Sequence, residues 1–129
     1  DGHAPATYPP CTMVAAQFLI EARRKALALN AMRYAQLRRV HASIATEIET
    51  HPTVGAELVD RARRQVALWA EAETCSPFYV RAWRRILRAH PEAGLRRLVE
   101  GNCGMTNAML QNSPFSFALT DARFAEPTE

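Results

Sequence analysis

Residues 76–91 read SPFYVRAWRRILRAHP and mark the clearest helix in the sequence. Ser76 suits the N-cap, and Pro77 suits the first helical position because its missing amide would have no intrahelical partner there. His90 precedes Pro91, whose ring disfavours a helical conformation at the residue before it. These signals predict a helix that begins at Pro77 and ends near His90.

The side chains of this helix separate into two faces when each residue turns the helix by about 100°. The first face is apolar and aromatic and is predicted to be buried; its members are Tyr79, Trp83, Ile86, Leu87 and His90. The second face is predicted to be exposed; its members are Arg81, Arg84, Arg85 and Arg88. We call this second set the arginine face.

A much longer helical segment precedes this helix. No residue between Met13 and Thr50 breaks a helix, and Thr12 can serve as the N-cap. Apolar residues recur in steps of three and four, joined through Asn30. A helix of that length would extend roughly 55 Å, which is longer than a domain of this size usually covers. Either the helix breaks near Asn30, or it continues and packs against another chain.

Shorter elements complete the pattern. Further helices are predicted at about 53–74, after His51-Pro52, from Pro91 to a stop at Gly101, and at about 105–111. Residues 113–117 read SPFSF, which is typical of a turn. Thr120-Asp121 would cap a last helix.

The composition favours helix throughout, because alanine, leucine and arginine are abundant and all three have high helix propensity. A chain of 129 residues that is 48% hydrophobic can bury one core. We therefore predict an all-α single domain, a helical bundle of four to six helices with a long first helix. It would span residues 13–124, between an extended arm at 1–12 and a tail at 125–129. The predicted core consists of Ile44, Ile48, Trp69, Tyr79, Trp83, Ile86 and Leu87.

One short pattern occurs twice. His51-Pro52-x-x-Gly55 recurs as His90-Pro91-x-x-Gly94, 39 residues later. Helical-repeat arrays have periods near this length, but they need about three copies, and here the match decays after the glycine. The pattern therefore favours two helix ends with the same stop chemistry over a true repeat.

Charge and cysteine content limit the environment. Basic residues outnumber acidic ones by 16 to 13, and between Val14 and Glu100 the numbers are 15 and 9, which permits an acidic partner.

The three cysteines cannot all pair within one chain and lack metal-ligand spacing, so a reducing cytoplasm is predicted. The uncharged residues 2–20 contain prolines and polar residues, so we expect no membrane span. A start at Asp1 without methionine predicts a trimmed or processed chain.

The arginine face has three alternative roles. A solvated outer face is the simplest, because an amphipathic helix needs a polar side. Guanidinium groups also hold carboxylates and phosphates, so an acidic protein partner and a nucleic acid are the other two. No zinc-finger, RNA-binding or helix-turn-helix motif accompanies the arginines, which favours the protein partner over the nucleic acid.

A second candidate partner surface consists of Met105, Met109, Phe115 and Phe117. Flexible thioethers and loop aromatics suit an adaptable contact surface. The alternative is that these side chains fold back and close the core.

Candidate catalytic residues are few. Cys75 lies before the N-cap Ser76, where a helix N-terminus could activate a thiol, although a small buried thiol is the simpler role. His51 and His90 lie at helix ends, where a structural role is expected. His41 belongs to the apolar stripe of the first helix and is expected to be half-buried. We predict no metal site and no cofactor.

Several residues carry a resemblance to a family. The series consists of Trp69, Ser76-Pro77, Tyr79, Trp83-Arg84, Leu87, Leu110-Gln111-Asn112-Ser113-Pro114-Phe115 and Arg123. It resembles a group of short, uncharacterised proteobacterial helical proteins with a Trp, Tyr, Trp series and a Ser-Pro-Phe tail. The resemblance would cover about residues 30–123, although this tail lacks an arginine that the group has after its leucine. It implies a bacterial origin and a whole-domain fold, and it implies no activity.

The sequence therefore predicts a non-enzymatic bacterial interaction or regulatory module. It would self-associate through the long first helix and offer the arginine face to an acidic partner. The alternative is a nucleic-acid-associated transcriptional regulator that uses the same face. A third possibility is a small enzyme that uses Cys75 or a histidine.

Overall fold

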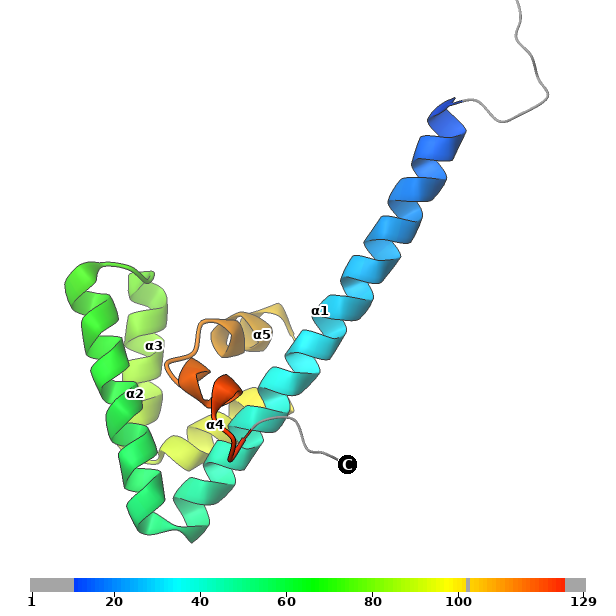
Figure 1. The fold of residues 1–129 in the computed structure, drawn as a ribbon. Coiled ribbons are helices and arrows are strands. Elements are labelled where there is room, and N and C mark those ends of the chain that lie inside the picture. The colour runs from blue at the N-terminus through cyan, green and yellow to red at the C-terminus, as the bar shows by residue number, and fades with distance from the viewer. Residues whose placement is uncertain (1–10, 102, 125–129) are drawn as a thin grey trace, which may run out of the picture. The chain divides into compact units, whose positions relative to one another are not determined.

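A computed structural model describes residues 11–101 and 103–124 (Figure 1). These residues form five α-helices and a short 3₁₀-helix, and no strand occurs among them. The elements are α1 (Cys11–Thr50), α2 (Pro52–Ala72), α3 (Pro77–Arg88), α4 (Pro91–Glu100), α5 (Gly104–Gln111) and the 3₁₀-helix Ser116–Thr120. The predicted all-α class and long first helix are confirmed. The chain divides into two units, residues up to Arg33 and residues 34–129.

The length of the first helix left open whether it breaks near Asn30. Helix α1 continues through Asn30 without a break. It already includes Cys11, so Thr12 lies inside the helix and the prediction that Thr12 is the N-cap is wrong. Of the predicted arm, residues 1–10 lie outside the described residues. The boundary between the two units falls within α1, after Arg33.

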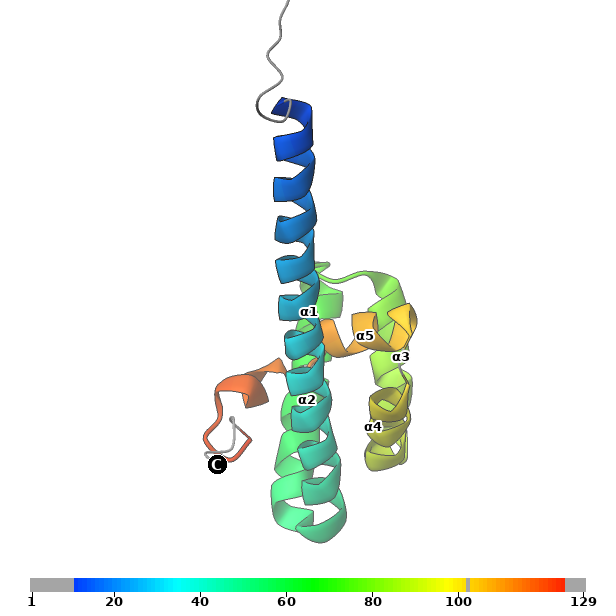
Figure 2. The same ribbon diagram turned by 90° about the vertical axis from the view of Figure 1, so that its right-hand side faces the viewer.

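In the second unit, the part of α1 from Tyr34 to Thr50 meets α2 at His51 and forms a V with it (Figure 1). Helices α3, α4 and α5 lie on one side of this V, and residues 116–124 lie on the other (Figure 2). The core fills the space between these elements. Its largest fully buried side chains are Trp83, Phe115, Ile44, Leu87, Leu95 and Leu110.

The predicted core is largely confirmed. Ile44, Trp83 and Leu87 are at most 2% exposed. The other four predicted members are partly buried and pack against the same cluster; they are Ile48, Trp69, Tyr79 and Ile86. His90 was predicted to share the buried face of α3, but its side chain is 80% exposed, because α3 ends at Arg88 and His90 is the N-cap of α4.

The two His-Pro-x-x-Gly patterns form two corners of the same kind. In each, histidine is the N-cap, proline opens the next helix, and the glycine amide donates to the histidine carbonyl. A Cβ on Gly55 would lie 2.6 Å from Ile48 Cα of the preceding helix, and a Cβ on Gly94 would lie 2.8 Å from Ile86 Cγ2. Glycine therefore allows consecutive helices to approach closely at both corners.

The end of the described chain differs from the prediction. Thr120 ends a 3₁₀-helix, and Asp121 has an extended backbone with φ −85° and ψ 130°. The Asp121 carboxylate accepts from the Arg123 amide at 2.9 Å and from the Arg123 guanidinium at 3.0 Å. Asp121 therefore caps a turn that closes at Phe124, and no α-helix begins at Thr120-Asp121 within the residues described up to Phe124.

Candidate interaction surfaces

The arginine face is exposed, as its spacing predicts. Ser76 begins α3, where its hydroxyl accepts from the Phe78 amide at 3.3 Å. The opposite side of α3 packs Val80, Trp83 and Leu87 into the core, which directs the arginines outward. The four members are exposed, and none of their side chains forms a hydrogen bond or ion pair with another described residue; they are Arg81, Arg84, Arg85 and Arg88. Helix α3 contains no acidic residue.

Two hollows lie along the seam between α2 and α3, and Arg84 borders both. The larger has a volume of about 760 Å³ and lies near the turn that joins the helices. Its lining includes Trp69, Ala70, Glu73, Cys75, Val80 and Arg81. The smaller has a volume of about 280 Å³ and is lined by Arg63, Val66, Ala67, Arg84, Leu87 and Arg88. We call the two hollows together the α2–α3 groove.

The predicted methionine and phenylalanine surface is divided by the structure. Met109 is 4% exposed and Phe115 is 0% exposed, so both belong to the core and the prediction that they face a partner is wrong for them. Met105 is 53% exposed. Phe117 is partly buried, with the Arg61 guanidinium 4.1 Å from its ring centroid. The second candidate surface therefore loses two of its members, because α5 buries Met109 and the turn at 113–117 places Phe115 in the core.

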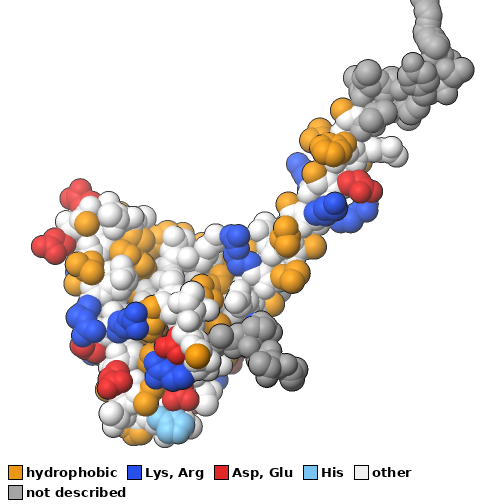
Figure 3. Space-filling model, viewed as in Figure 1, with side chains coloured by type: hydrophobic (Ala, Val, Ile, Leu, Met, Phe, Trp, Pro, Cys, Tyr) orange, Lys and Arg blue, Asp and Glu red, His pale blue; other side chains and the backbone are white. Residues whose placement is uncertain are grey.

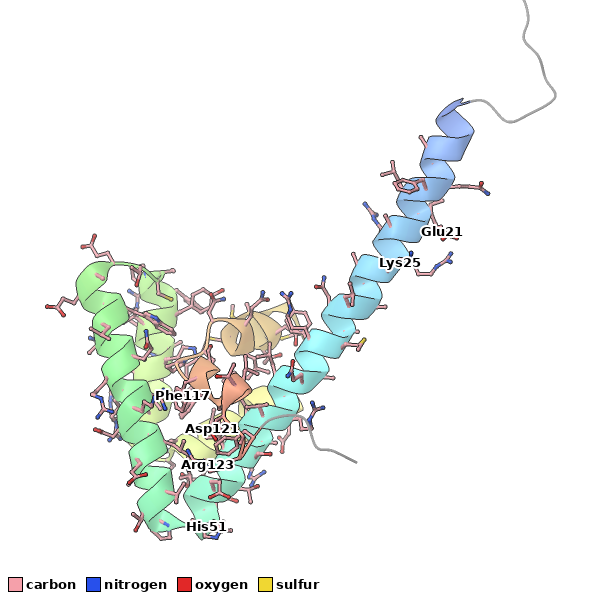
Figure 4. All side chains as sticks on the ribbon, viewed as in Figure 1. Glu21, Lys25, His51, Phe117, Asp121 and Arg123 are labelled. Atoms are coloured by element: carbon pink, nitrogen blue, oxygen red, sulfur yellow. The ribbon has the colours of Figure 1, made fainter. Side chains whose placement is uncertain are left out.

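Residues 15–33 of α1 carry large apolar side chains that are exposed, and only one of them, Leu19, belongs to the apolar stripe that the sequence predicted. Six large apolar side chains there are between 57% and 72% exposed: Phe18, Leu19, Ile20, Leu27, Leu29 and Met32. Figure 3 shows hydrophobic side chains along this part of α1 with basic side chains between them. Glu21 and Lys25 lie one turn apart on the same side of the helix (Figure 4).

His41 is buried more deeply than its place in the stripe predicted. It is 0% exposed, and its ring lies 6.4 Å from that of Trp83 and 6.1 Å from that of Phe115. Burial lowers its pKa to about 4, and the bond to the Leu37 carbonyl opposes this shift only in part. A neutral imidazole without access to solvent has a structural role. Its Nε2 contacts the hydroxyl of Ser113, and the sequence spacing of these two residues gives no signal that they pair.

Reactive groups do not gather at one place in the described chain. Cys75 is partly buried at the α2–α3 groove, whose lining includes no histidine. Cys103 is exposed at the start of α5, where the Thr106 amide and then the Thr106 hydroxyl lower the pKa of its thiol. No group of three metal-ligating side chains occurs among the described residues.

Comparisons with known proteins give no guide to the role of these surfaces. No protein-family model, curated protein or solved structure matches the chain. The resemblance to proteobacterial helical proteins stays a prediction. Within the described part of the chain, no helix has both the length and the apolar character needed to cross a membrane.

Proposed function

We propose that the protein is a non-enzymatic interaction module that self-associates through residues 15–33 of α1 and offers the arginine face to an acidic partner. The observation that carries this proposal is the exposed apolar surface of α1. Six large apolar side chains fall within the fifteen positions from Phe18 to Met32, and each is more than half exposed.

The size of this surface supports an interface. A typical stable complex buries about 800 Å² of each partner, and six large apolar side chains that are each more than half exposed can supply a large part of the apolar area of such an interface. Isolated exposed apolar residues are common, but a contiguous surface of several hundred Å² marks an interaction site. Residues 15–33 therefore offer large apolar side chains to a partner on more than one side of α1.

The distribution around the helix supports a second copy as the partner. Leu19, Ala22 and Ala26 continue one stripe, with Leu29 beside it, while Ile20 and Leu27 lie on another side. A helix that is apolar on more than one side is normally covered by more than one helix. Alanines in the stripe allow two backbones to approach closely, so one further copy of α1 can cover the stripe and another can cover Ile20 and Leu27.

Light scattering after size exclusion tests this proposal, with a dimer or higher oligomer expected for the unmodified chain. Leu19→Glu and Leu29→Glu should give a monomer, because each buries a carboxylate in the apolar stripe. Ala28→Glu is the matched control, since Ala28 lies with Gln17, Glu21 and Arg24 on the polar side and should leave the oligomer intact. A monomer for the unmodified chain at high concentration, or equal dissociation by all three variants, contradicts the proposal.

Salt gives a second test of the same interface. Residues 15–33 contain four basic side chains and one acidic one, so two copies repel each other electrostatically. Screening should therefore strengthen self-association as ionic strength rises. Association that weakens with added salt would show that charge pairing, rather than the apolar surface, holds the copies together.

A second function is favoured by the unpaired arginine face. A row of guanidinium groups can follow a phosphate backbone, which supports a nucleic-acid-associated transcriptional regulator as the alternative. That function predicts binding to duplex DNA that weakens steeply with salt and is lost when Arg84, Arg85 and Arg88 are all changed to alanine. Binding that survives the triple change, or no binding at low salt, contradicts this alternative.

A further inference from the structure

We infer that the α2–α3 groove binds an acidic segment of a partner protein that inserts one apolar anchor side chain. This inference rests on the acidic partner of the proposed function and assigns that partner a site and a chemistry. Helices α2 and α3 lie side by side and are joined by the turn at 73–76 (Figure 1). The groove therefore lies between α2 and α3, and the turn at 73–76 borders one end of it.

The floor of the groove is apolar and continuous with the core. Val66 and Leu87 are at most 2% exposed, and Val80 is 5% exposed, so their positions are fixed by core packing. Trp69 and Ala70 are partly buried and pack against the same cluster. Trp69, Ala70 and Val80 line the larger hollow of about 760 Å³, which can receive a large aliphatic or aromatic side chain, whereas Val66 and Leu87 line the smaller one.

The rim of the groove is basic. Its lining includes Arg63, Arg81, Arg84 and Arg88, against the single carboxylate of Glu73 near the turn. Arg63 is held in place because its guanidinium donates to the Leu87 carbonyl. The guanidinium groups of the three α3 arginines form no hydrogen bond or ion pair with another described residue and can therefore bind carboxylates.

The spacing of the free arginines fits a short acidic segment. Arg81 and Arg88 lie seven residue steps apart in α3, with Arg84 between them, which corresponds to about 10 Å along the helix axis. Carboxylates repeated at three- and four-residue steps on a partner helix would have the same separation. Bidentate pairs between guanidinium and carboxylate then set the register of the partner along the groove.

The apolar floor favours a protein segment over a nucleic acid. A phosphate backbone would satisfy the arginines but would leave the surface of Trp69, Ala70 and Val80 without an apolar partner. An acidic peptide with one leucine satisfies both the rim and the floor. Arg85 provides a contrast, because it belongs to the arginine face but does not line the groove.

The test uses the full chain and a synthetic helical peptide that is rich in glutamate and carries one central leucine. Calorimetry gives the affinity, and the emission of Trp69 reports on the groove, since the other tryptophan, Trp83, is fully buried. Arg84→Gln should weaken binding by about tenfold, because it removes a charge-assisted pair. Arg85→Gln should weaken it by no more than about twofold, because it removes only a distant charge.

Three controls keep the outcomes distinct. A peptide with alanine in place of the leucine should bind about tenfold more weakly, because it lacks the anchor. Equal loss in Arg84→Gln and Arg85→Gln, an unchanged affinity without the leucine, or no peptide binding overturns the inference. Duplex DNA that binds more tightly than the peptide overturns it in favour of a nucleic acid. Self-association is measured separately by light scattering, so its failure leaves the result for the groove intact.

Discussion

His41 Nε2 lies 2.6 Å from the hydroxyl oxygen of Ser113, and the two residues are 72 positions apart in the chain. The other ring nitrogen, Nδ1, lies 2.7 Å from the Leu37 carbonyl oxygen, which can only accept, so Nδ1 carries the proton. Nε2 then accepts from the Ser113 hydroxyl, and the Ser113 oxygen in turn accepts from the Phe115 amide at 3.0 Å. This chain of bonds ties α1 to the turn that follows α5.

We expect the free energy of unfolding to fall by about 2 kcal/mol between pH 7.5 and pH 5 because of His41. Burial lowers the pKa of His41 from 6.5 to about 4, so the unfolded state takes up a proton in this range and the folded state does not. Stability is therefore lost as pH falls below 6.5. Urea unfolding at several pH values measures how steeply the free energy of unfolding changes with pH.

His41→Gln provides the control for this slope, since glutamine does not titrate. The variant will be less stable at pH 7.5, but its stability should change little between pH 7.5 and pH 5. Hydrogen bonds from Arg96 and Arg123 lower the pKa values of the Glu49 and Asp121 carboxyls. These two carboxyls therefore change the free energy of unfolding mainly below pH 4.5, outside the range tested. An equal slope in both proteins would show that His41 is not its source.

Ser113→Ala should reduce the free energy of unfolding by about 1–3 kcal/mol, because it leaves His41 Nε2 and the Phe115 amide without partners inside the core. Ser116→Ala is the matched control three residues away. The Ser116 hydroxyl donates to the Ser113 carbonyl at 2.7 Å, but Ser116 is exposed and water can replace this bond. Chemical denaturation compares the two, and equal losses would contradict the importance of the buried network.

Short sequence patterns that mark helix ends predicted the helices. These patterns gave no information on the contacts between segments that are distant in the chain. Ser76-Pro77 and the two His-Pro pairs fix helix ends through backbone chemistry, and each acts within a few residues. The exposure of the arginine face follows from helical period alone. The burial of Met109 and Phe115 depends on how α5 and the 113–117 turn pack against distant segments, and this packing includes the His41–Ser113 bond, for which spacing gives no signal.

Gly55→Ala should lower the free energy of unfolding by about 1–3 kcal/mol, because the added Cβ would lie 2.6 Å from the Ile48 backbone and force α1 and α2 apart. Gly104→Ala should instead raise it by about 0.4–1 kcal/mol, since the added Cβ would meet no atom within 4 Å apart from the adjoining backbone, and alanine restricts the unfolded chain. Thermal unfolding of both variants checks the sign. A neutral Gly55→Ala would show that the corner relaxes without cost.

Repulsion among the arginines of the arginine face should destabilise α3. Arg81→Gln should therefore raise the free energy of unfolding by about 0.5 kcal/mol at low salt. Arg81 faces Arg84 and Arg85 at three- and four-residue spacing, and such like-charge pairs destabilise a helix by about 0.2–0.5 kcal/mol each. Arg88→Gln is the comparison, because Arg88 lies in the last turn of α3, where the helix dipole favours a cation. The Arg88→Gln variant loses this favourable interaction with the helix dipole but also loses repulsion from its neighbouring arginines. The two effects should offset each other, so the free energy of unfolding should change by less than about 0.3 kcal/mol. Unfolding at low and high salt measures both effects, and the gain from Arg81→Gln should shrink as salt rises. A loss of stability in Arg81→Gln at low salt would show that this side chain stabilises the α2–α3 groove by packing rather than standing free at its rim.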